Sequence, residues 1–389
     1  MTVSSARTSQ LRDSEIRRMS ALCQTVGGVN LAQGFPDFES PVEIRDAARA
    51  AIAADVSQYA PTQGTARLRG AIADHYRRRD ARWTMDPDAN VCVTCGGTEA
   101  IFAAMAAALK PGDEVIVPEP FYESYGPVAV LLGAVPRYVP LRNDWTLDLD
   151  ALWAAGGPRT AMIVLNFPHN PSGSLLDAAE AKAIGDIAGR WDAVVLSDEL
   201  YDHLVFDGPM VHPALERGAG QRTVTVGGIS KTYSLTGWRI GWTVAPPALT
   251  TVIKRIHDVV TCGAAAPLQD AAVTALSLGA SYDDRLKADY IARRNLLCNG
   301  LEQAGFTFVR PRGGYFVLAN YSALDSRSDD KEFAHRLLAE AGVAGVPGSY
   351  FFSRSGSTQL LRFAFCKKLD TLQEAVGRLL SWNSREKRQ

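Results

Sequence analysis

Short apolar segments alternate with helical patterns through much of this chain, and the alternation limits the possible folds more than any other feature. Between about residues 46 and 248, segments typical of strands are 114–118, 137–139, 161–165, 193–197, 223–226 and 240–244. Patterns typical of helices lie between them, at 98–110, 122–132 and 177–190. Segment 161–165 is almost continuously apolar, as expected for a parallel strand covered on both faces. The alternation predicts a doubly wound α/β domain, in which ligands lie beyond the carboxyl ends of the strands.

The C-terminal part of the chain has a different pattern. A long charged helix is expected at 282–304, followed by strands at 306–309, 314–318 and 359–364 and a helix near 331–341. This pattern is typical of a smaller α+β domain. We therefore predict a large domain with a mostly parallel central sheet over residues 46–285 and a small domain over 286–389. The N-terminal segment 1–45 is expected to join the small domain.

The charge balance and hydropathy exclude several classes of protein. Among 389 residues, 41 Lys and Arg stand against 42 Asp and Glu, which gives a net charge of −1. This chain has no basic excess for gripping a nucleic-acid backbone. Its longest apolar run, 101–109, is far shorter than the roughly 20 residues of a membrane span. The polar N-terminus lacks the apolar core of a secretory signal. We expect no nucleic-acid or membrane partner and a cytoplasmic location.

Several common motifs are absent. The sequence contains no phosphate-binding G-x-x-x-x-G-K-[ST], no H-E-x-x-H and no G-x-G-x-x-G. Its six histidines show no spacing typical of metal ligands. Cys92 and Cys95 form a single C-x-x-C at the end of an expected strand, with no second pair to complete a zinc set. We therefore expect no metal site.

Polar residues follow four of the expected strands. Gly97 and Thr98 open a helix after segment 90–94, and a helix N-terminus can bind an anion. The loop 166–173 contains Asn166 and Asn170 with two prolines. Taken singly, a turn explains each of these segments as well as a site does.

Two further strand ends carry charge. Asp198 follows segment 193–197, where a carboxylate is costly unless it is paired, although it could also cap a helix. Lys231 follows segment 223–226, where a lysine is more often solvated.

The combination of these residues at one sheet edge points to pyridoxal 5′-phosphate. A lysine can form a Schiff base with its aldehyde. A carboxylate can pair with its pyridinium nitrogen. A helix N-terminus can bind its phosphate, and tyrosine or asparagine can bond its phenolic oxygen. No competing cofactor uses all four features.

With these motifs in place, the chain resembles the fold-type I, class I/II aminotransferases from about Asn30 to Lys368. It is most similar to the kynurenine/glutamine/methionine aminotransferase group and to aspartate-aminotransferase-like relatives. The segments that carry the resemblance are 30–36 (NLAQGFP), 58–64 (QYAPTQG), 166–173 (NFPHNPSG), 197–201 (SDELY), 230–239 (SKTYSLTGWR) and 361–365 (LRFAF).

The resemblance implies a role for each matching residue. Lys231 would form the Schiff base and move the proton, Asp198 would hold the pyridinium nitrogen, and Tyr201 and Asn170 would bond the phenolic oxygen. Tyr122 would stack on the ring. The phosphate would be bound by Gly97, Thr98, Ser230 and Arg239, and by Tyr59 of a neighbouring subunit in a homodimer with shared active sites. Arg362 would hold the substrate carboxylate, assisted by Asn166, Asn170 and Gly34. Phe35, Tyr125 and Tyr315 could equally be core residues or touch the substrate. Some family members carry a phosphate-binding serine where this chain has Gly228.

The implied activity is a ping-pong transamination. An L-amino acid, aromatic or similar to methionine or glutamine, would donate its amino group to a 2-oxo acid. One alternative keeps the cofactor but expels a β-substituent, as a cysteine-conjugate β-lyase does. A remote alternative is a ligand-sensing, non-catalytic aminotransferase-like domain.

Overall fold

The computed structural model describes residues 7–11, 13–353, 356 and 358–386. Within these residues a central sheet of seven strands forms, and only β8 runs antiparallel to its neighbours. The strands, in order across the sheet, are β2 (Val91–Thr94), β8 (Gly241–Val244), β7 (Thr223–Gly228), β6 (Val194–Asp198), β5 (Thr160–Asn166), β3 (Glu114–Glu119) and β4 (Val135–Pro140).

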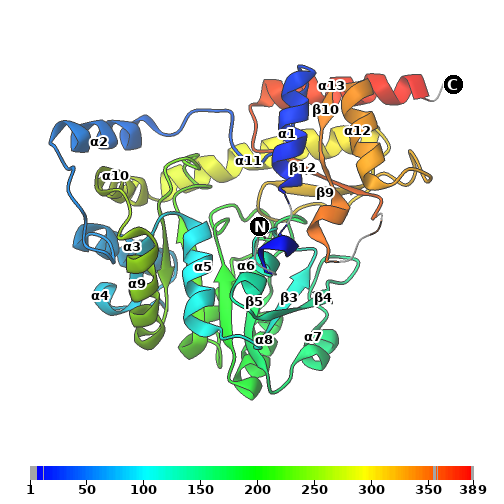
Figure 1. Ribbon diagram of the computed structural model, residues 1–389. Helices are drawn as coiled ribbons and strands as arrows, with labels where there is room; N and C mark the ends of the chain where they lie inside the picture. Colours follow the sequence, from blue (N-terminus) through cyan, green and yellow to red (C-terminus); the bar gives the residue numbers. More distant parts are fainter. Residues whose placement is uncertain (1–6, 12, 354–355, 357, 387–389) are drawn as a thin grey trace, which may run out of the picture.

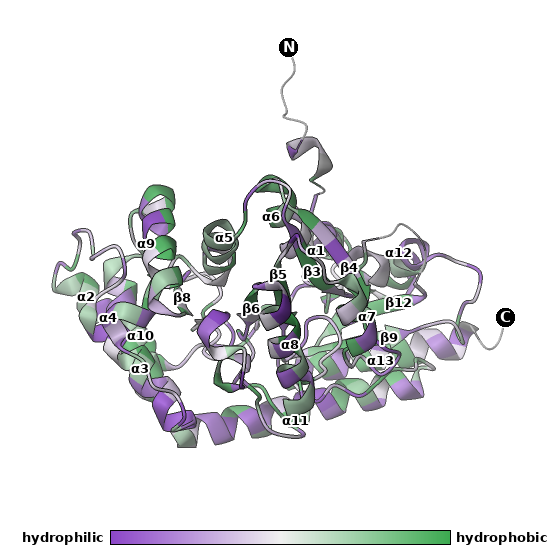
Figure 2. Ribbon diagram, turned by 90° about the horizontal axis from the view of Figure 1, so that it is seen from below, coloured by the Kyte–Doolittle hydropathy of each residue, from purple (hydrophilic) through white to green (hydrophobic). Residues whose placement is uncertain are grey.

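Alternate residues of the central strands enter different cores, because side chains in a strand point to opposite faces. Val115 and Val117 pack on the face covered by α5 (Gly97–Ala108), α6 (Tyr125–Leu131) and α9 (Pro247–Thr261). Ile116 packs on the other face, against α7 (Leu149–Ala155) and α8 (Ala178–Trp191). In Figure 2 these central strands are coloured mostly hydrophobic, whereas the long helix α11 (Ala280–Gln303) carries many hydrophilic residues. The predicted α/β fold with a mostly parallel central sheet is confirmed.

A second hydrophobic core is formed mainly by the C-terminal elements. β11 (Val346–Pro347), β12 (Leu360–Ala364) and β9 (Phe316–Asn320) form an antiparallel sheet, and β1 (Val29–Asn30) pairs with β10 (Val343–Ala344). Met19 of α1 (Glu15–Thr25) is buried with Leu337 and Leu379 in this core. Figure 1 shows α1 beside α12 (Asp330–Ala341) and α13 (Leu369–Glu386), with α11 reaching from α10 (Ala266–Ser277) to α13.

The predicted domain bounds stay a prediction. The N-terminal residues contact the C-terminal elements through β1 and α1, but α11 runs without interruption through the expected boundary at 285/286. Residues 1–6, 12, 354–355, 357 and 387–389 of the two terminal segments lie outside the described residues.

Three predicted elements differ from the structure. The helix expected from residue 122 begins at Tyr125, because residues 123–124 form a turn and Phe121 N donates to Phe351 O (2.8 Å), in the C-terminal part of the chain. The strand expected at 306–309 is reduced to one bridge at Thr307, while the Phe306 ring packs against Phe363. The next strand begins at Phe316 rather than at Gly314, whose φ of +67° is left-handed and not extended.

The remaining helices were not predicted from the sequence. They are α2 (Val42–Ala53), α3 (Ala66–Arg79) and α4 (Pro87–Asn90), with short 3₁₀ helices at Thr8–Gln10, Pro213–Leu215, Gly220–Arg222 and Gly348–Phe351. Of the helices in the described part of the chain, none combines the length and apolar character of a membrane span.

Candidate active site

A cavity of about 120 Å³ lies where β5, β6 and β7 reach their carboxyl ends. Most of the residues expected at the site from sequence line it, and Ile101 and Leu200 were not anticipated. Both follow a predicted site residue closely, so their spacing from Thr98 and Asp198 could have indicated them. The cavity is lined by Gly97, Thr98, Ile101, Tyr122, Asn166, Asn170, Asp198, Leu200, Tyr201, Ser230, Lys231 and Arg239.

The N-terminus of α5 forms an anion-binding corner of this cavity. Its N-cap, Gly96, has a φ of +82°, and a Cβ there would lie 2.5 Å from Nη2 of Arg239. Arg239 donates from Nη1 to Thr236 O (3.0 Å) and from Nη2 to Thr98 Oγ1 (3.4 Å). Ser230 Oγ is buried and makes no hydrogen bond within the described residues. Free helix amides, a guanidinium and an unsatisfied hydroxyl together suit a phosphate.

At Gly228, where some family members have a serine, a side chain would be crowded. A Cβ at this position would lie 3.1 Å from both Ile240 O and Leu200 Cδ2. The neighbouring atoms of Ile240 and Leu200 would have to move by a few tenths of an ångström to admit a side chain at Gly228, whereas Ser230 already lines the cavity.

Asp198 is buried at the end of β6 and is held by two donors. Tyr125 Oη donates to Oδ2 (2.6 Å), and Leu200 N donates to Oδ1 (3.3 Å). Burial raises the pKa of Asp198 to about 6, while the Tyr125 hydrogen bond and the charge of Lys231 act in the opposite direction. Tyr125 is thus a buried partner of Asp198.

Lys231 is buried beside two aromatic rings. Its Nζ lies 5.9 Å from the ring centroids of both Tyr201 and Tyr315. Burial lowers the pKa of Lys231 to about 8, because the charged amine loses its solvation. Burial also raises the pKa of Tyr201, which keeps its hydroxyl protonated and able to donate.

Arg362 lies on β12, outside the residues that line the cavity but bonded to one of them. It is 1% exposed, donates from Nη1 to Asn170 Oδ1 (2.9 Å) and from Nη2 to Ala32 O (2.9 Å), and leaves Nε without a partner in the described part of the chain. Its guanidinium lies 4.1 Å from the Phe316 ring centroid. Burial lowers the pKa of Arg362 to about 10, so the side chain remains cationic at neutral pH.

The two asparagines connect Arg362 to Asp198. Asn170 N donates to Asn166 Oδ1 (3.0 Å), and Asn166 Nδ2 donates to Asp198 O (3.2 Å). A continuous series of hydrogen bonds therefore joins the ends of β5 and β6 to β12.

Gly34 and Tyr59 lie apart from the cavity. Gly34 O accepts a hydrogen bond from Tyr315 Oη (2.8 Å), and a Cβ at Gly34 would lie 2.6 Å from Phe316 Cζ. This places Gly34 beside the aromatic residues that surround Arg362. Tyr59 is 90% exposed in the loop between α2 and α3 and does not line the cavity of its own chain.

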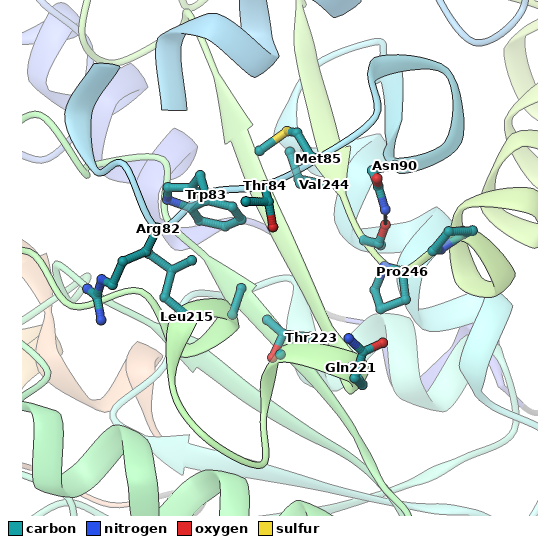
Figure 3. Close-up of a pocket in the computed structure, with 14 residues that line it drawn as sticks. Arg82, Trp83, Thr84, Met85, Asn90, Leu215, Gln221, Thr223, Val244 and Pro246 are labelled. Carbon is teal, nitrogen blue, oxygen red and sulfur yellow. Dashed lines mark hydrogen bonds between the residues drawn. The ribbon is translucent and has the colours of Figure 1, made fainter. Parts of the chain in front are cut away.

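A second cavity, of about 290 Å³, lies at the opposite edge of the sheet, where β7 begins and β8 ends (Figure 3). Its lining includes Trp83, Asn90, Thr223 and Val244, and none of the predicted site residues. Asn90 Nδ2 donates to Ala245 O (2.8 Å), so this side chain joins two strand ends. The predicted site residues that line a cavity lie at the other edge of the sheet, around Lys231.

Comparison with known proteins agrees with this geometry. The family model for aminotransferase class I and II matches residues 26–379. The probable N-succinyldiaminopimelate aminotransferase of Mycobacterium tuberculosis is 41% identical over 374 residues, which cover 93% of this chain and 94% of the relative. The methionine aminotransferase of Escherichia coli is 35% identical over 376 residues, covering 95% of this chain and 96% of the relative.

Solved structures give the same result. The M. tuberculosis N-succinyldiaminopimelate aminotransferase superimposes with a TM-score of 0.94 at 39% identity, covering 98% of this chain and all (100%) of the other. An aspartate aminotransferase from Thermus thermophilus with maleate gives a TM-score of 0.90 at 31% identity over 98% of this chain and 100% of the other. The family match over most of the chain, together with a lysine, a carboxylate and an anion-binding helix end around one cavity, identifies the chain as a pyridoxal-phosphate-dependent member of the class I and II aminotransferases.

Proposed function

We propose that the cavity around Lys231 transfers the amino group of an aromatic or methionine-like L-amino acid to a 2-oxo acid. The observation that carries this proposal is a pair of buried donors, Ser230 Oγ and Arg362 Nε, that no described residue satisfies. A buried donor without a partner costs about 1–3 kcal/mol. Two anions would satisfy them, a phosphate beside α5 and a carboxylate beside Asn170.

The residues of the cavity suit pyridoxal phosphate at each of its polar groups. When bound, this cofactor supplies an aldehyde that condenses with amino groups and a pyridinium ring that withdraws electrons. Asp198 is placed to pair with the ring nitrogen, and Tyr122 to stack on the ring. The other proposed contacts are Gly97, Thr98, Ser230 and Arg239 to the phosphate, and Tyr201 and Asn170 to the phenolic oxygen.

Lys231 is the proposed proton carrier. Its Nζ would hold the cofactor in the absence of substrate and would be a free amine once an amino acid is bound. With a pKa of about 8, a useful fraction of this amine is unprotonated near neutral pH. The free Nζ would then take the proton from the substrate α-carbon and hold it for return to the reacting carbons.

Arg362 is the proposed site for the substrate α-carboxylate. Its planar guanidinium can form a bidentate pair with a carboxylate, and it is held from two sides by Asn170 and Ala32. Asn166 and Gly34 support this arrangement through Asn170 and the Tyr315–Phe316 aromatic pair.

The aromatic residues around Arg362 favour an apolar substrate side chain. Phe316 and Phe351 pack against the guanidinium, and Phe35 is 37% exposed nearby, beside the ammonium of Lys367. The relatives include enzymes named for methionine, aromatic amino acids and N-succinyldiaminopimelate.

The test is the visible spectrum of the cofactor-loaded protein with single donors and no oxo acid. Methionine, phenylalanine and kynurenine should bleach the cofactor band faster than aspartate, and a 2-oxo acid should restore it. N-succinyl-LL-diaminopimelate belongs in the same panel. Exclusive response to that compound or to aspartate would contradict the proposed substrate class. Release of ammonia and pyruvate from a β-substituted donor, without bleaching, would favour the β-lyase.

We also propose a homodimer in which Tyr59 reaches the phosphate site of the neighbouring chain. Tyr59 is 90% exposed, and Val259 of α9 is 87% exposed. Large exposed aromatic and apolar side chains are typical of surfaces that another chain covers. The cytoplasmic location remains a prediction from the sequence.

A further inference from the structure

A cluster of potential metal ligands lies outside the candidate active site. His75 comes from α3, whereas Asp202 and His203 come from the turn after β6. One ligand atom of each residue lies within 4.8 Å of the other two. The histidines show no ligand spacing along the chain because 128 residues separate them, and only the fold brings them together.

The separation of the two histidines matches that of ligands on one ion. Nε2 of His75 and Nε2 of His203 are 3.1 Å apart. Zinc–nitrogen bonds are about 2.0–2.1 Å long, so two tetrahedral ligands lie about 3.3 Å apart. The observed distance therefore requires little movement to admit an ion.

His203 is oriented as metal-binding histidines usually are. Its Nδ1 lies 2.8 Å from Asp283 Oδ1, and this contact favours the tautomer with the proton on Nδ1. Nε2 then carries the lone pair, which accepts a hydrogen bond from His75 Nε2 (3.1 Å) and would turn to the ion when His75 gives up that proton.

Asp202 supplies a negative charge to the cluster, with Arg79 as its ion-pair partner. The nearest cation, Nη2 of Arg79, lies 3.9 Å from Asp202 Oδ2 and donates its hydrogen bond to the backbone oxygen of Asp202 instead. The Asp202 side chain is 12% exposed. A buried carboxylate is stabilised by a coordinated cation.

We propose that His75, Asp202 and His203 bind a divalent transition-metal ion of the zinc class. Two imidazoles and one carboxylate suit this class of ion, with water completing the coordination. The ion would tie α3 to the turn that carries Tyr201 and directly follows Asp198 at the end of β6. His203 additionally packs against Tyr233, two residues after Lys231, with the ring centroids 6.1 Å apart. Metal binding should therefore stabilise the turn after β6 and the segment around Tyr233, which both lie beside the active site.

The test uses untagged, cofactor-loaded protein that has been stripped with chelator and dialysed against zinc chloride. We expect about one tightly bound ion per chain and a higher melting temperature. His75→Asn and His203→Asn should weaken zinc binding by at least about 100-fold, and Asp283→Asn by roughly tenfold. His335→Asn, on α12 and outside the cluster, is the matched control and should bind zinc normally.

Zinc held by the cofactor itself would survive His75→Asn, so unchanged binding in that variant would overturn the proposal. Absence of binding at micromolar zinc would also overturn it and leave the two imidazoles as a simple hydrogen-bonded pair. If the histidine variants fail to fold, the visible absorption of cobalt(II) bound to the unmodified protein tests the proposal instead. A four-coordinate site gives intense visible absorption, and its absence would count against the cluster.

Discussion

Tyr125 controls the charge on the residue that is proposed to hold the cofactor ring. Its hydroxyl donates a 2.6 Å hydrogen bond to Asp198, which opposes the rise in the Asp198 pKa caused by burial. Tyr125→Phe should raise that pKa further and weaken cofactor binding by about tenfold, because hydrogen bonds to charged groups are worth roughly 1.5–3 kcal/mol. The measurement is the dissociation constant for pyridoxal phosphate by absorbance titration.

The matched control for this substitution is Tyr321→Phe. Tyr321 is buried in the other core, and its hydroxyl donates to Ser328 O (3.1 Å). This variant should lose stability without any change in cofactor affinity. Equal affinities in the two variants would show that the Tyr125 hydrogen bond does not act on the cofactor.

The pKa of Lys231 sets the pH dependence of cofactor attachment. Burial lowers this pKa to about 8, so the amine is protonated and unreactive below pH 8 and free above it. The rate at which stripped protein attaches pyridoxal phosphate should therefore rise by about tenfold per pH unit below pH 8 and level off above it. Stopped-flow absorbance from pH 6 to 10 tests this. A rate that keeps rising beyond pH 9 would indicate an ordinary, solvated lysine.

Among the secondary-structure elements, the N-terminus of α5 depends most on one backbone position. Gly96 has a left-handed φ of +82°, and a Cβ there would meet the Arg239 guanidinium at 2.5 Å. Gly96→Ala should displace Arg239 and reduce phosphate-dependent cofactor binding at least tenfold, an effect that adds to the strain of placing alanine at φ +82° and ψ 171°, a backbone conformation essentially restricted to glycine.

The variant Gly112→Ala is the control that distinguishes the effect of crowding by the new Cβ from the effect of backbone strain. Gly112 has a similar φ of +89°, but nothing lies within 4 Å of its Cβ position. Both variants should melt at a lower temperature, and only Gly96→Ala should bind the cofactor weakly. Weak binding by both would mean that strain alone explains the loss.

The grouping of the residues at the strand ends could be predicted from sequence, because it follows from the parallel arrangement of the strands. Parallel strands bring their carboxyl ends to one edge, so Asn166, Asp198 and Lys231 were expected together, and all three line one cavity. The partner of Asp198 could not be predicted. Whether Tyr125 reaches it depends on where α6 begins, and the sequence pattern places that start at Tyr122. The approach of His75 to His203 depends on how α3 packs against a distant turn, which local patterns do not contain.

At the scale of the whole molecule, the proposed homodimer with shared active sites makes a prediction about mixed chains. Lys231→Ala and Tyr59→Ala chains should each be impaired, because one lacks the lysine and the other the proposed phosphate contact from its neighbour. In a mixed dimer, one site combines the intact Lys231 of one chain with the intact Tyr59 of the other. Refolding the two together should recover about a quarter of the unmodified activity. Activity no greater than the average of the separate variants would contradict a shared site.

The most direct test of the account is to locate the cofactor on the chain. Cofactor-loaded protein is reduced with borohydride, digested, and its peptides are analysed by mass spectrometry. The account predicts a phosphopyridoxyl group on Lys231 alone, and its loss when an amino-acid donor is added before the borohydride. A label on another lysine, or a label on Lys231 that no amino acid removes, would contradict the proposed role of this cavity.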